Sequence, residues 1–439
     1  MSLFGAMNSA ISGLGAQSNA FGNISDNVAN SQTVGFKRVD TNFVSYLTTS
    51  TAARNEPGAV VARPDYVNNV QGTVTQIDNP LGLAIAGQGF FAVSQQTGQV
   101  NNAPVFNPLQ FYTRAGDFQL NKAGYLVNSA GQFLNGWEVD PLTGDANQNA
   151  LAPIQISQTV FNPVATTEVV LSANLPATPL AETATADAPI SSDIDVYDAL
   201  GTVHAVTLNW VQDSADTWTV SVVSEDATTP DLGSAVVKFG AGSLNPVPAG
   251  TVGDISDATG SVTAAGYSAG GAAILSFTAE FSSGSQTIQL NLGNYGDTSG
   301  ITQYAGTRYS LRGLTQNGVA PGSFSGVSTQ ANGDIVVNYD NGQTRAIAKV
   351  PLITFNNPNA LQRQNGQSFT ATLESGNPLA EEASTNGAGN IVTESIEGSN
   401  VDIASEFSKL IVAQRAYSAN TKVVTTADEL LQQTIDMKR

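Results

Sequence analysis

The sequence predicts an α+β multidomain protein, in which helices from both chain ends form a coiled-coil domain and mainly antiparallel β domains are nested between them. Three observations support this fold class. Apolar residues recur every three or four positions near both ends, and short alternating segments separated by Asn/Gly turns fill the middle. All 18 prolines lie between Pro57 and Pro378. Because proline breaks helices, long helices are expected only at the two ends.

The N-terminal segment, Met1 to Asn30, has an apolar stripe at a 4-3-4-3 spacing, which is typical of a coiled-coil seam. The predicted seam positions here are Leu3, Met7, Leu14, Phe21, Ile24 and Val28. Glycines at positions 5, 13, 15 and 22 interrupt this helix, and each costs about 1 kcal/mol relative to alanine. We therefore expect this helix to be marginal alone and to form only when its stripe is covered.

The C-terminal segment, residues 399–439, repeats the spacing without glycine or proline. Its predicted seam positions are Ile403, Phe407, Leu410, Tyr417, Val424, Leu431 and Ile435. Ser399 followed by Asp402 resembles a capping box, so the helix is expected to begin there. We interpret both seams as self-assembly surfaces that form one terminal helical domain from residues 1–33 and 399–439. The alternative is an antiparallel helical hairpin inside a monomer.

Between the helices, the sequence predicts a nested order. Residues 34–70 and 360–398 are expected to be irregular, extended connecting arms. A β domain is expected from residues 71–150 with 301–359, since strand-like segments alternate with turns such as Asp340-Asn341-Gly342. Residues 151–300 form a second, inserted outer β domain. Strands are predicted near Val196–Tyr197, Val206–Trp210, Trp218–Val223 and Ala273–Phe281, and loops from Pro246 to Gly271.

Charge and composition exclude several classes of function. The net charge is −19, and residues 151–300 contain 15 acidic residues and one basic residue, whereas nucleic-acid binding needs a basic surface. There is no cysteine for disulfides or thiolate chemistry. No apolar run is long enough for a membrane span, and the N-terminus lacks the features of a cleaved signal peptide. Composition thus allows a cytoplasmic protein or one exported by a route that uses no cleaved signal.

The candidate chemical sites have simpler structural explanations. Gly87-Gln88-Gly89 lacks the third glycine and the helix of a dinucleotide site. Asp193, Asp195 and Asp198 lack the glycine and distal glutamate of a calcium loop. His204 is the one histidine, and no nucleophile motif accompanies it. We predict no enzyme activity, no cofactor and no metal.

Several long motifs resemble the axial proteins of the bacterial flagellum, the rod and hook subunits. The segments 23–38, 399–402 and 413–420 resemble the terminal signatures of that family, and 85–91 with 113–118 resemble its β domain. Within the family, the segment Asp195 to His204 resembles the outer-domain motif of hook subunits. Distal rod subunits are similar at both ends but lack so large an insertion.

The resemblance implies a hook subunit that polymerises into a curved, flexible tube and transmits torque from rod to filament as a universal joint. It also implies an extracellular flagellar location and export through the flagellar type III apparatus. The implied partners are copies of the chain itself, the distal rod protein, the hook cap and the hook-filament junction protein. Two alternatives stay open: a distal rod subunit, or a secreted monomeric β-rich binding or adhesive protein.

Overall fold

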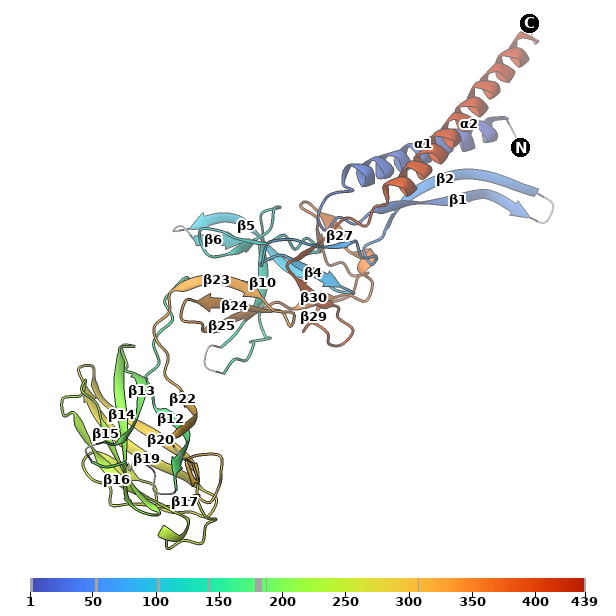
Figure 1. Ribbon diagram of the computed structural model, residues 1–439. Helices are drawn as coiled ribbons and strands as arrows, with labels where there is room; N and C mark the ends of the chain where they lie inside the picture. The colour runs from blue at the N-terminus through green and yellow to red at the C-terminus, as the bar shows by residue number, and fades with distance from the viewer. Residues whose placement is uncertain are drawn as a thin grey trace. The chain divides into compact units, whose positions relative to one another are not determined.

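The computed structural model describes residues 3–51, 54–100, 103–140, 143–177, 184–186, 188–306 and 308–437. The chain divides into two compact units. Figure 1 shows the chain coloured by residue number from blue at the N-terminus to red at the C-terminus. The first unit comprises Met1–Gln158, Ser325–Asn338 and Thr344–Arg439, and the second comprises Thr159–Phe324 and Tyr339–Gln343. The second unit is thus an insertion into the first.

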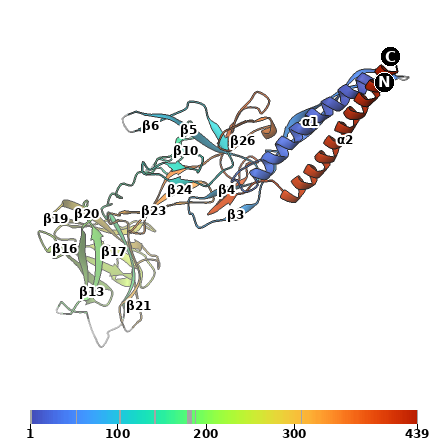
Figure 2. The same cartoon turned by 90° about the horizontal axis from the view of Figure 1, so that it is seen from above.

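The first unit contains the long helices α1 (Leu3–Ala29) and α2 (Ile403–Asp436). The helices lie side by side, and both chain ends lie at the same end of the pair (Figures 1 and 2). The predicted start of α2 at Ser399 is wrong. Asp402 is the N-cap, and its carboxylate accepts a 2.7 Å hydrogen bond from the Ser405 N–H. The reason is that Asn400, just before it, is held against the N-terminal segment through the carbonyls of Phe36, Val67 and Val70.

The segment expected to be an irregular arm after α1 instead forms a long antiparallel hairpin. Its strands are β1 (Val39–Thr51) and β2 (Arg54–Tyr66), and their register runs from Val39 opposite Tyr66 to Thr51 opposite Arg54. The hairpin packs along α1. The sequence of this segment, with its Pro57, Gly58 and Pro64, carries no local signal for a strand, and the contact with α1 supports the hairpin instead.

The β-sheet part of the first unit has one extended sheet with the strand order β23-β24-β25-β10-β5-β7-β28-β27, which β6, β8, β9 and β11 join at the side. These strands are β5 (Phe91–Val100), β6 (Ala103–Phe106), β7 (Phe111–Thr113), β8 (Gln119–Leu120), β9 (Leu126–Val127), β10 (Gln132–Glu138), β11 (Ala152–Pro153), β23 (Phe324–Thr329), β24 (Asp334–Tyr339), β25 (Thr344–Lys349), β27 (Gln362–Gln364) and β28 (Ser368–Thr370). The predicted hairpin around Asn341-Gly342 is confirmed, because β24 pairs antiparallel with β25.

The second predicted arm, 360–398, is also more regular than expected. Short strands in it pair with strands far away in the sequence. The pairs are β3 (Val74–Gln76) with β31 (Ser395–Glu397), β4 (Leu83–Ala86) with β30 (Asn390–Thr393), and β26 (Leu352–Thr354) with β29 (Leu379–Glu381). Strands of three or four residues carry too little periodicity to be seen in a sequence.

The second unit consists of two sheets, which have the orders β13-β14-β15-β16-β17 and β18-β19-β20-β12-β21, with β22 paired to β12. The strands are β12 (Glu168–Pro176), β13 (Ile190–Tyr197), β14 (Val203–Ser214), β15 (Thr217–Val223), β16 (Asp231–Phe239), β17 (Val252–Ser256), β18 (Val262–Ala264), β19 (Ala272–Phe281), β20 (Gly284–Asn294), β21 (Thr302–Tyr304) and β22 (Ser310–Gln316). Strands were predicted at β13, β14, β15 and β19, and these predictions are confirmed. The predicted loop 246–271 instead contains β17 and β18.

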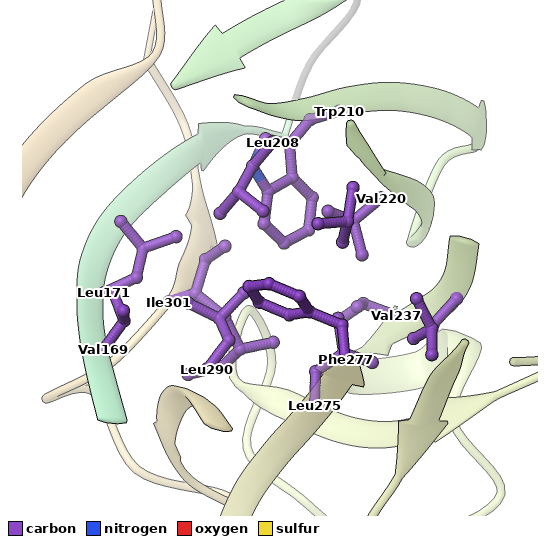
Figure 3. Packing of buried hydrophobic residues seen from close by; sticks show 14 of the residues in the cluster. Val169, Leu171, Leu208, Trp210, Val220, Val237, Leu275, Phe277, Leu290 and Ile301 are labelled. Carbon is purple, nitrogen blue, oxygen red and sulfur yellow. The ribbon is translucent and has the colours of Figure 1, made fainter. Parts of the chain in front are cut away.

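The core of the second unit lies between its two sheets. Side chains of both sheets point toward one another, among them Trp210 and Val220 from one sheet and Leu171, Phe277 and Leu290 from the other (Figure 3). This unit ends later than the insert predicted at 151–300, because β21 and β22 both pair with β12. Such pairing between residues 128 or more apart has no local sequence signal.

Candidate self-assembly surface

The helices α1 and α2 meet along a stripe of small and polar residues that recurs every seven positions. Residues 6, 13, 20 and 27 of α1 face residues 427, 420, 413 and 406 of α2. An Asn27 amide hydrogen donates to Glu406 at 3.1 Å, and a Cβ added to Gly13 would lie 2.8 Å from the Asn420 side chain. The pair is therefore antiparallel within one chain, which is the arrangement that we held as the alternative. Small residues allow this close approach.

The predicted seam residues lie beside this stripe rather than on it. Ile24 is buried, and Leu3, Met7, Leu14, Phe21, Val28, Leu410, Val424 and Leu431 are half-buried. The remaining four are exposed, at 44% for Ile403, 50% for Phe407, 42% for Tyr417 and 64% for Ile435. The prediction weighted large side chains and missed the heptad repeat of alanine, glycine and asparagine, which the sequence does contain.

The helix pair consequently presents apolar side chains that the chain itself does not cover. Further exposed positions on the helices are Phe4, Ile11, Ile411, Val412, Val423 and Leu430. One groove of about 470 Å³ lies between the start of α1 and residues 419–430 of α2 and includes Leu3, Val423 and Leu430 in its lining. A second groove, of about 510 Å³, lies between α1, α2 and β1. Contiguous exposed apolar surface of this kind marks an interaction site.

A buried polar cluster fixes the base of the helix pair. The Asn27 side chain donates to the Val39 carbonyl at 2.9 Å and accepts from the Val39 N–H at 2.9 Å. Glu406 is 1% exposed and also accepts from Lys409, which in turn forms an ion pair with Asp40. Burial opposes the charge on Lys409, but hydrogen bonds to Asp40 and Glu406 outweigh it and raise its pKa. The cluster joins α1, β1 and α2.

A second buried cluster joins both terminal segments to the β-sheet part of the first unit. Glu397 forms ion pairs with Lys37 and Arg114, and the three side chains are at most 3% exposed. Glu397 also accepts from the Gly72 N–H at 2.8 Å, and its carbonyl accepts from the Gly35 N–H at 2.8 Å. Desolvation by burial lowers the pKa of Lys37 to about 8, against the opposing effect of Glu397. Sequence reasoning missed this cluster.

At Arg114 and Gly35, the close packing around this cluster limits which side chains fit. The Arg114 guanidinium donates to the Gly87 carbonyl at 2.7 Å and lies 5.2 Å from the centre of the Phe90 ring. Gly35 has a φ of +68°, and a Cβ there would lie 2.4 Å from the Ala115 backbone nitrogen. Only glycine fits that position. The motif segments 23–38, 85–91 and 113–118 therefore meet at one junction.

The residues that we set aside as chemical candidates have structural contacts. Gly87 and Gly89 have φ values of +110° and +130° and lie against Gly389 and Leu352. In the second unit, His204 lies 3.2 Å from the Asp198 carboxylate and stacks on Phe281 at 4.0 Å. Burial opposes the charge on Asp198, but hydrogen bonds from Ser283, Thr202, His204 and Leu200 hold its pKa well below the usual value. This arrangement closes the turn between β13 and β14.

Among residues 3–437, with the gaps stated above, no group of three or more His, Asp or Glu side chains is arranged to hold a metal ion. Neither α1 nor α2, over their described lengths, is apolar enough to cross a membrane.

Comparison with known proteins gives matches along most of the chain. Residues 84–174 match the flagellar hook protein FlgE/F/G D1 domain, residues 165–319 match the flagellar basal body protein FlaE D2 domain, and residues 392–437 match the flagellar basal body rod FlgEFG protein C-terminal family. The crystal structure of Helicobacter pylori flagellar hook protein FlgE2 is similar with a TM-score of 0.48 and 14% identity, over 72% of this chain and 98% of that one.

Three relatives are similar over essentially their whole length. The flagellar hook protein FlgE of Brucella suis is 32% identical over 100% of both chains. Its counterpart in Rhizobium meliloti is 30% identical, also over 100% of both chains. That of Salmonella typhimurium is 28% identical over 98% of this chain and 99% of its own. With full-length identity of this degree and three matching domains in the family's order, the chain belongs to the flagellar hook protein family, which is structural and not enzymatic.

Proposed function

We propose that this hook subunit assembles with copies of itself into a curved, flexible tube that transmits torque from rod to filament as a universal joint. Hook proteins are components of the flagellum outside the cell. One observation carries the mechanism. Apart from an edge-to-face contact between the Phe21 and Tyr417 rings, α1 and α2 meet mainly through small and polar residues. Phe407 and Ile435 on α2 are 50% and 64% exposed. Neighbouring copies in a polymer would cover these side chains.

The energetics favour assembly through this surface. Burying one large apolar side chain contributes roughly 1.5–3 kcal/mol. Since four predicted seam residues and several more positions on α1 and α2 are exposed, a neighbour that covers half a dozen of them would supply on the order of 10 kcal/mol before the ordering cost is subtracted. The seams Leu3 to Val28 and Ile403 to Ile435 would then act as coiled-coil seams between copies, in addition to the antiparallel contact inside each copy.

We propose that successive segments of the chain lie at different distances from the axis of the tube. Residues 1–33 with 399–439 would line the inside of the tube, 34–70 with 360–398 would connect them to the β domain of 71–150 with 301–359, and the acidic insert of 151–300 would face water. Polar contacts between outer domains can exchange as the tube bends, because hydrated contacts cost little to break. The distal rod protein, the hook cap and the junction protein are the proposed neighbours at the tube ends.

We also propose that the chain leaves the cell unfolded through the flagellar type III apparatus without a cleaved signal. The weak helix α1 and the absence of cysteine support this route. A chain without disulfides unfolds without reduction, and α1 contains four glycines that lower its stability.

The test is polymerisation of the purified full chain, seeded or induced with a precipitant and followed by electron microscopy and sedimentation. The chain should form tubes. Phe407→Ser, which removes an exposed ring from α2, should raise the concentration needed for assembly at least tenfold, since roughly 1.5–3 kcal/mol of burial is lost per contact. The matched control is Leu244→Ser, because Leu244 is fully exposed in the second unit.

The outcomes separate the two parts of the proposal. A wild-type chain that stays monomeric under all seeding conditions contradicts self-assembly. If wild type forms tubes and Phe407→Ser assembles at the same concentration as Leu244→Ser, assembly does not use the exposed face of α2.

A further inference from the structure

We propose that the outer edge of β1 is a strand-docking site, which receives an extended segment of a second copy of this chain. The proposal rests on the self-assembly proposed above and names a second contact for it. Exposed sheet edges bind extended segments through main-chain hydrogen bonds, and this mode of recognition recurs in protein complexes. Three features of β1 point to this role: the direction of its backbone groups, the groove beside it and the side chains along its edge.

The hydrogen-bond pattern of the hairpin shows which backbone groups of β1 point outward. In an antiparallel pair, opposite residues alternate between bonding each other and pointing away. Asn27 bonds both the N–H and the carbonyl of Val39, and Ser12 accepts from the Val60 N–H at 3.1 Å. Val39 in β1 and Val60 in β2 therefore each direct their backbone polar groups away from the partner strand. Since Val60 is opposite Ser45, Ser45 also points its N–H and carbonyl outward.

The same alternation extends along the edge. Phe43 is opposite Ala62 and Thr41 is opposite Pro64, which has no N–H to donate across the ladder. Thr41, Phe43 and Ser45 thus each direct an N–H and a carbonyl away from β2. Within the residues that the structure describes, these outward backbone groups have no hydrogen-bond partner, whereas those of Val39 are satisfied by Asn27. Three successive outward residues are enough for a short strand to pair.

A groove of about 510 Å³ runs along this edge. Val39, Thr41 and Phe43 of β1 form one wall, Ala20 and Ile24 belong to α1, and Val412 and Ala413 belong to α2. The charged groups in the groove are paired with each other, since Lys409 bonds both Asp40 and Glu406. The uncharged polar residues Gln17, Ser405 and Ser408 also line the groove. An entering segment would therefore meet a mixed apolar and polar lining with open backbone groups, and it would not have to remove an unpaired charge from water.

The edge strand of the second unit shows how this chain protects an edge. Strand β13 pairs only with β14 in the described chain, and it carries Asp193 and Asp195 on its exposed positions. Charged side chains on an edge oppose pairing with another strand. The stretch from Thr41 to Leu47 of β1 carries no charge, and its Phe43, Tyr46 and Leu47 are 44–57% exposed. An unprotected edge of this length is the kind that pairs.

The occupant is a second copy of this chain. The family assembles as a homopolymer, and Val412 belongs both to the groove and to the exposed apolar face of α2 that we propose for self-assembly. A segment that adds to β1 would thus extend the same contact. The docking segment of the second copy must be extended and carry few charges. Such stretches are common in this chain, because only 12% of its residues are charged.

The first test compares Ser45→Pro with Ser45→Ala in the full chain. Both variants lose the hydroxyl, but only proline removes the outward N–H, and proline is tolerated on an edge where the N–H faces solvent. Ser45→Pro should raise the concentration needed for assembly at least tenfold, and Ser45→Ala should stay within twofold of wild type. Circular dichroism and thermal unfolding of the monomers check that Ser45→Pro folds.

A second test needs no folding-sensitive variant. In wild-type protein, the amides of Phe43 and Ser45 should exchange rapidly in the monomer and become protected at least a hundredfold in the polymer. A benzophenone attached through Ser45→Cys, in a chain that otherwise has no cysteine, should cross-link two copies in the polymer. Cross-links within a single chain, or only to a different protein, would overturn the assignment of the occupant.

The inference and the proposed function fail in different ways. If wild type and Ser45→Pro assemble at the same concentration and the two amides stay unprotected in the tubes, the edge is not a docking site and self-assembly stands. If wild type itself does not assemble, the proposed function fails and the docking site fails with it.

Discussion

The second unit buries its largest side chains, whereas the helix pair of the first unit leaves many of its own exposed. Trp210, Trp218 and Phe277 are at most 1% exposed between the two sheets of the second unit. In α1 and α2, the buried apolar residues are mostly alanines, and large residues such as Phe407 and Ile435 face outward. The second unit completes its core within a single chain, whereas the helix pair keeps apolar side chains exposed that only another molecule could bury.

The difference also concerns how each region is held. The sandwich of the second unit depends on close packing of apolar side chains, which is cooperative. In the terminal region, a polar cluster around Glu406 joins α1, β1 and α2 to one another, and a second cluster around Glu397 joins the terminal segments to the β-sheet part of the first unit. A buried cluster of charges is sensitive to the loss of one member, because the remaining charges are left unpaired. The terminal region should thus respond strongly to a few polar substitutions.

The largest expected effect is that of Glu397→Ala. It leaves Lys37 and Arg114 buried without their shared carboxylate, so we expect the first unit to lose about 3–5 kcal/mol of unfolding free energy. The second unit should unfold as in wild type. Urea unfolding combined with peptide-resolved hydrogen exchange separates the two units.

The control for Glu397→Ala is Glu374→Gln, since Glu374 is an exposed carboxylate of the same unit. It should change stability by less than about 0.5 kcal/mol. A loss in Glu397→Ala no greater than that of the control would mean that the cluster does not hold the terminal segments. An equal loss in both units would show that the effect is not confined to the first unit.

The next effect is a pH dependence confined to the first unit. The pKa of Lys37 is lowered from 10.5 to about 8, chiefly by desolvation, with Arg114 acting in the same direction and Glu397 against it. Between these two pKa values, the unfolded chain binds more protons at this site than the folded chain does. The unfolding free energy should therefore rise as the pH rises from about 8 toward 10.5, by at most on the order of 3 kcal/mol.

The measurement compares wild type with Lys37→Met from pH 7.5 to 10. Methionine does not titrate, so the difference between the two unfolding curves isolates Lys37 from the other lysines and tyrosines. Parallel curves over this range would show that Lys37 keeps an ordinary pKa and that Glu397 fully offsets the burial.

The two regions differ in how far their structure can be predicted from the sequence. The insert, the helical ends and the longer strands of the second unit follow from hydrophobic periodicity, for example in β14 and β19. The contact between α1 and α2 does not follow from hydrophobic periodicity, because its positions hold alanine, glycine, asparagine and glutamate. A search for large apolar residues selects the positions beside them instead. The hairpin β1–β2 was missed because its support comes from α1 and not from local propensity.

The buried clusters were beyond sequence reasoning for a different reason. Lys37 and Glu397 are 360 residues apart, and Arg114 and Glu397 are 283 apart. Nothing local distinguishes a buried charge from a solvated one. The low overall share of charged residues, 12%, was the one usable signal, since it makes each charge inside a family motif worth examining.

The smallest expected effect tests the close approach of the two helices. Gly22 in α1 has open space around an added Cβ, so Gly22→Ala should stabilise α1 by about 1 kcal/mol through helix propensity alone. Gly13→Ala brings the same propensity, but its Cβ would lie 2.8 Å from the Asn420 side chain, so part or all of the gain should be lost. Hydrogen exchange of the α1 amides in the monomer measures both changes.

A double variant decides whether the contact with Asn420 is the cause. In Gly13→Ala with Asn420→Ala, the facing side chain is shortened, and the gain of about 1 kcal/mol should return once the effect of Asn420→Ala alone is subtracted. If Gly13→Ala already stabilises α1 as much as Gly22→Ala does, the helices are not in close contact at residue 13. The seven-residue stripe would then not define how α1 and α2 pack, and the contrast with the tightly packed second unit would be sharper still.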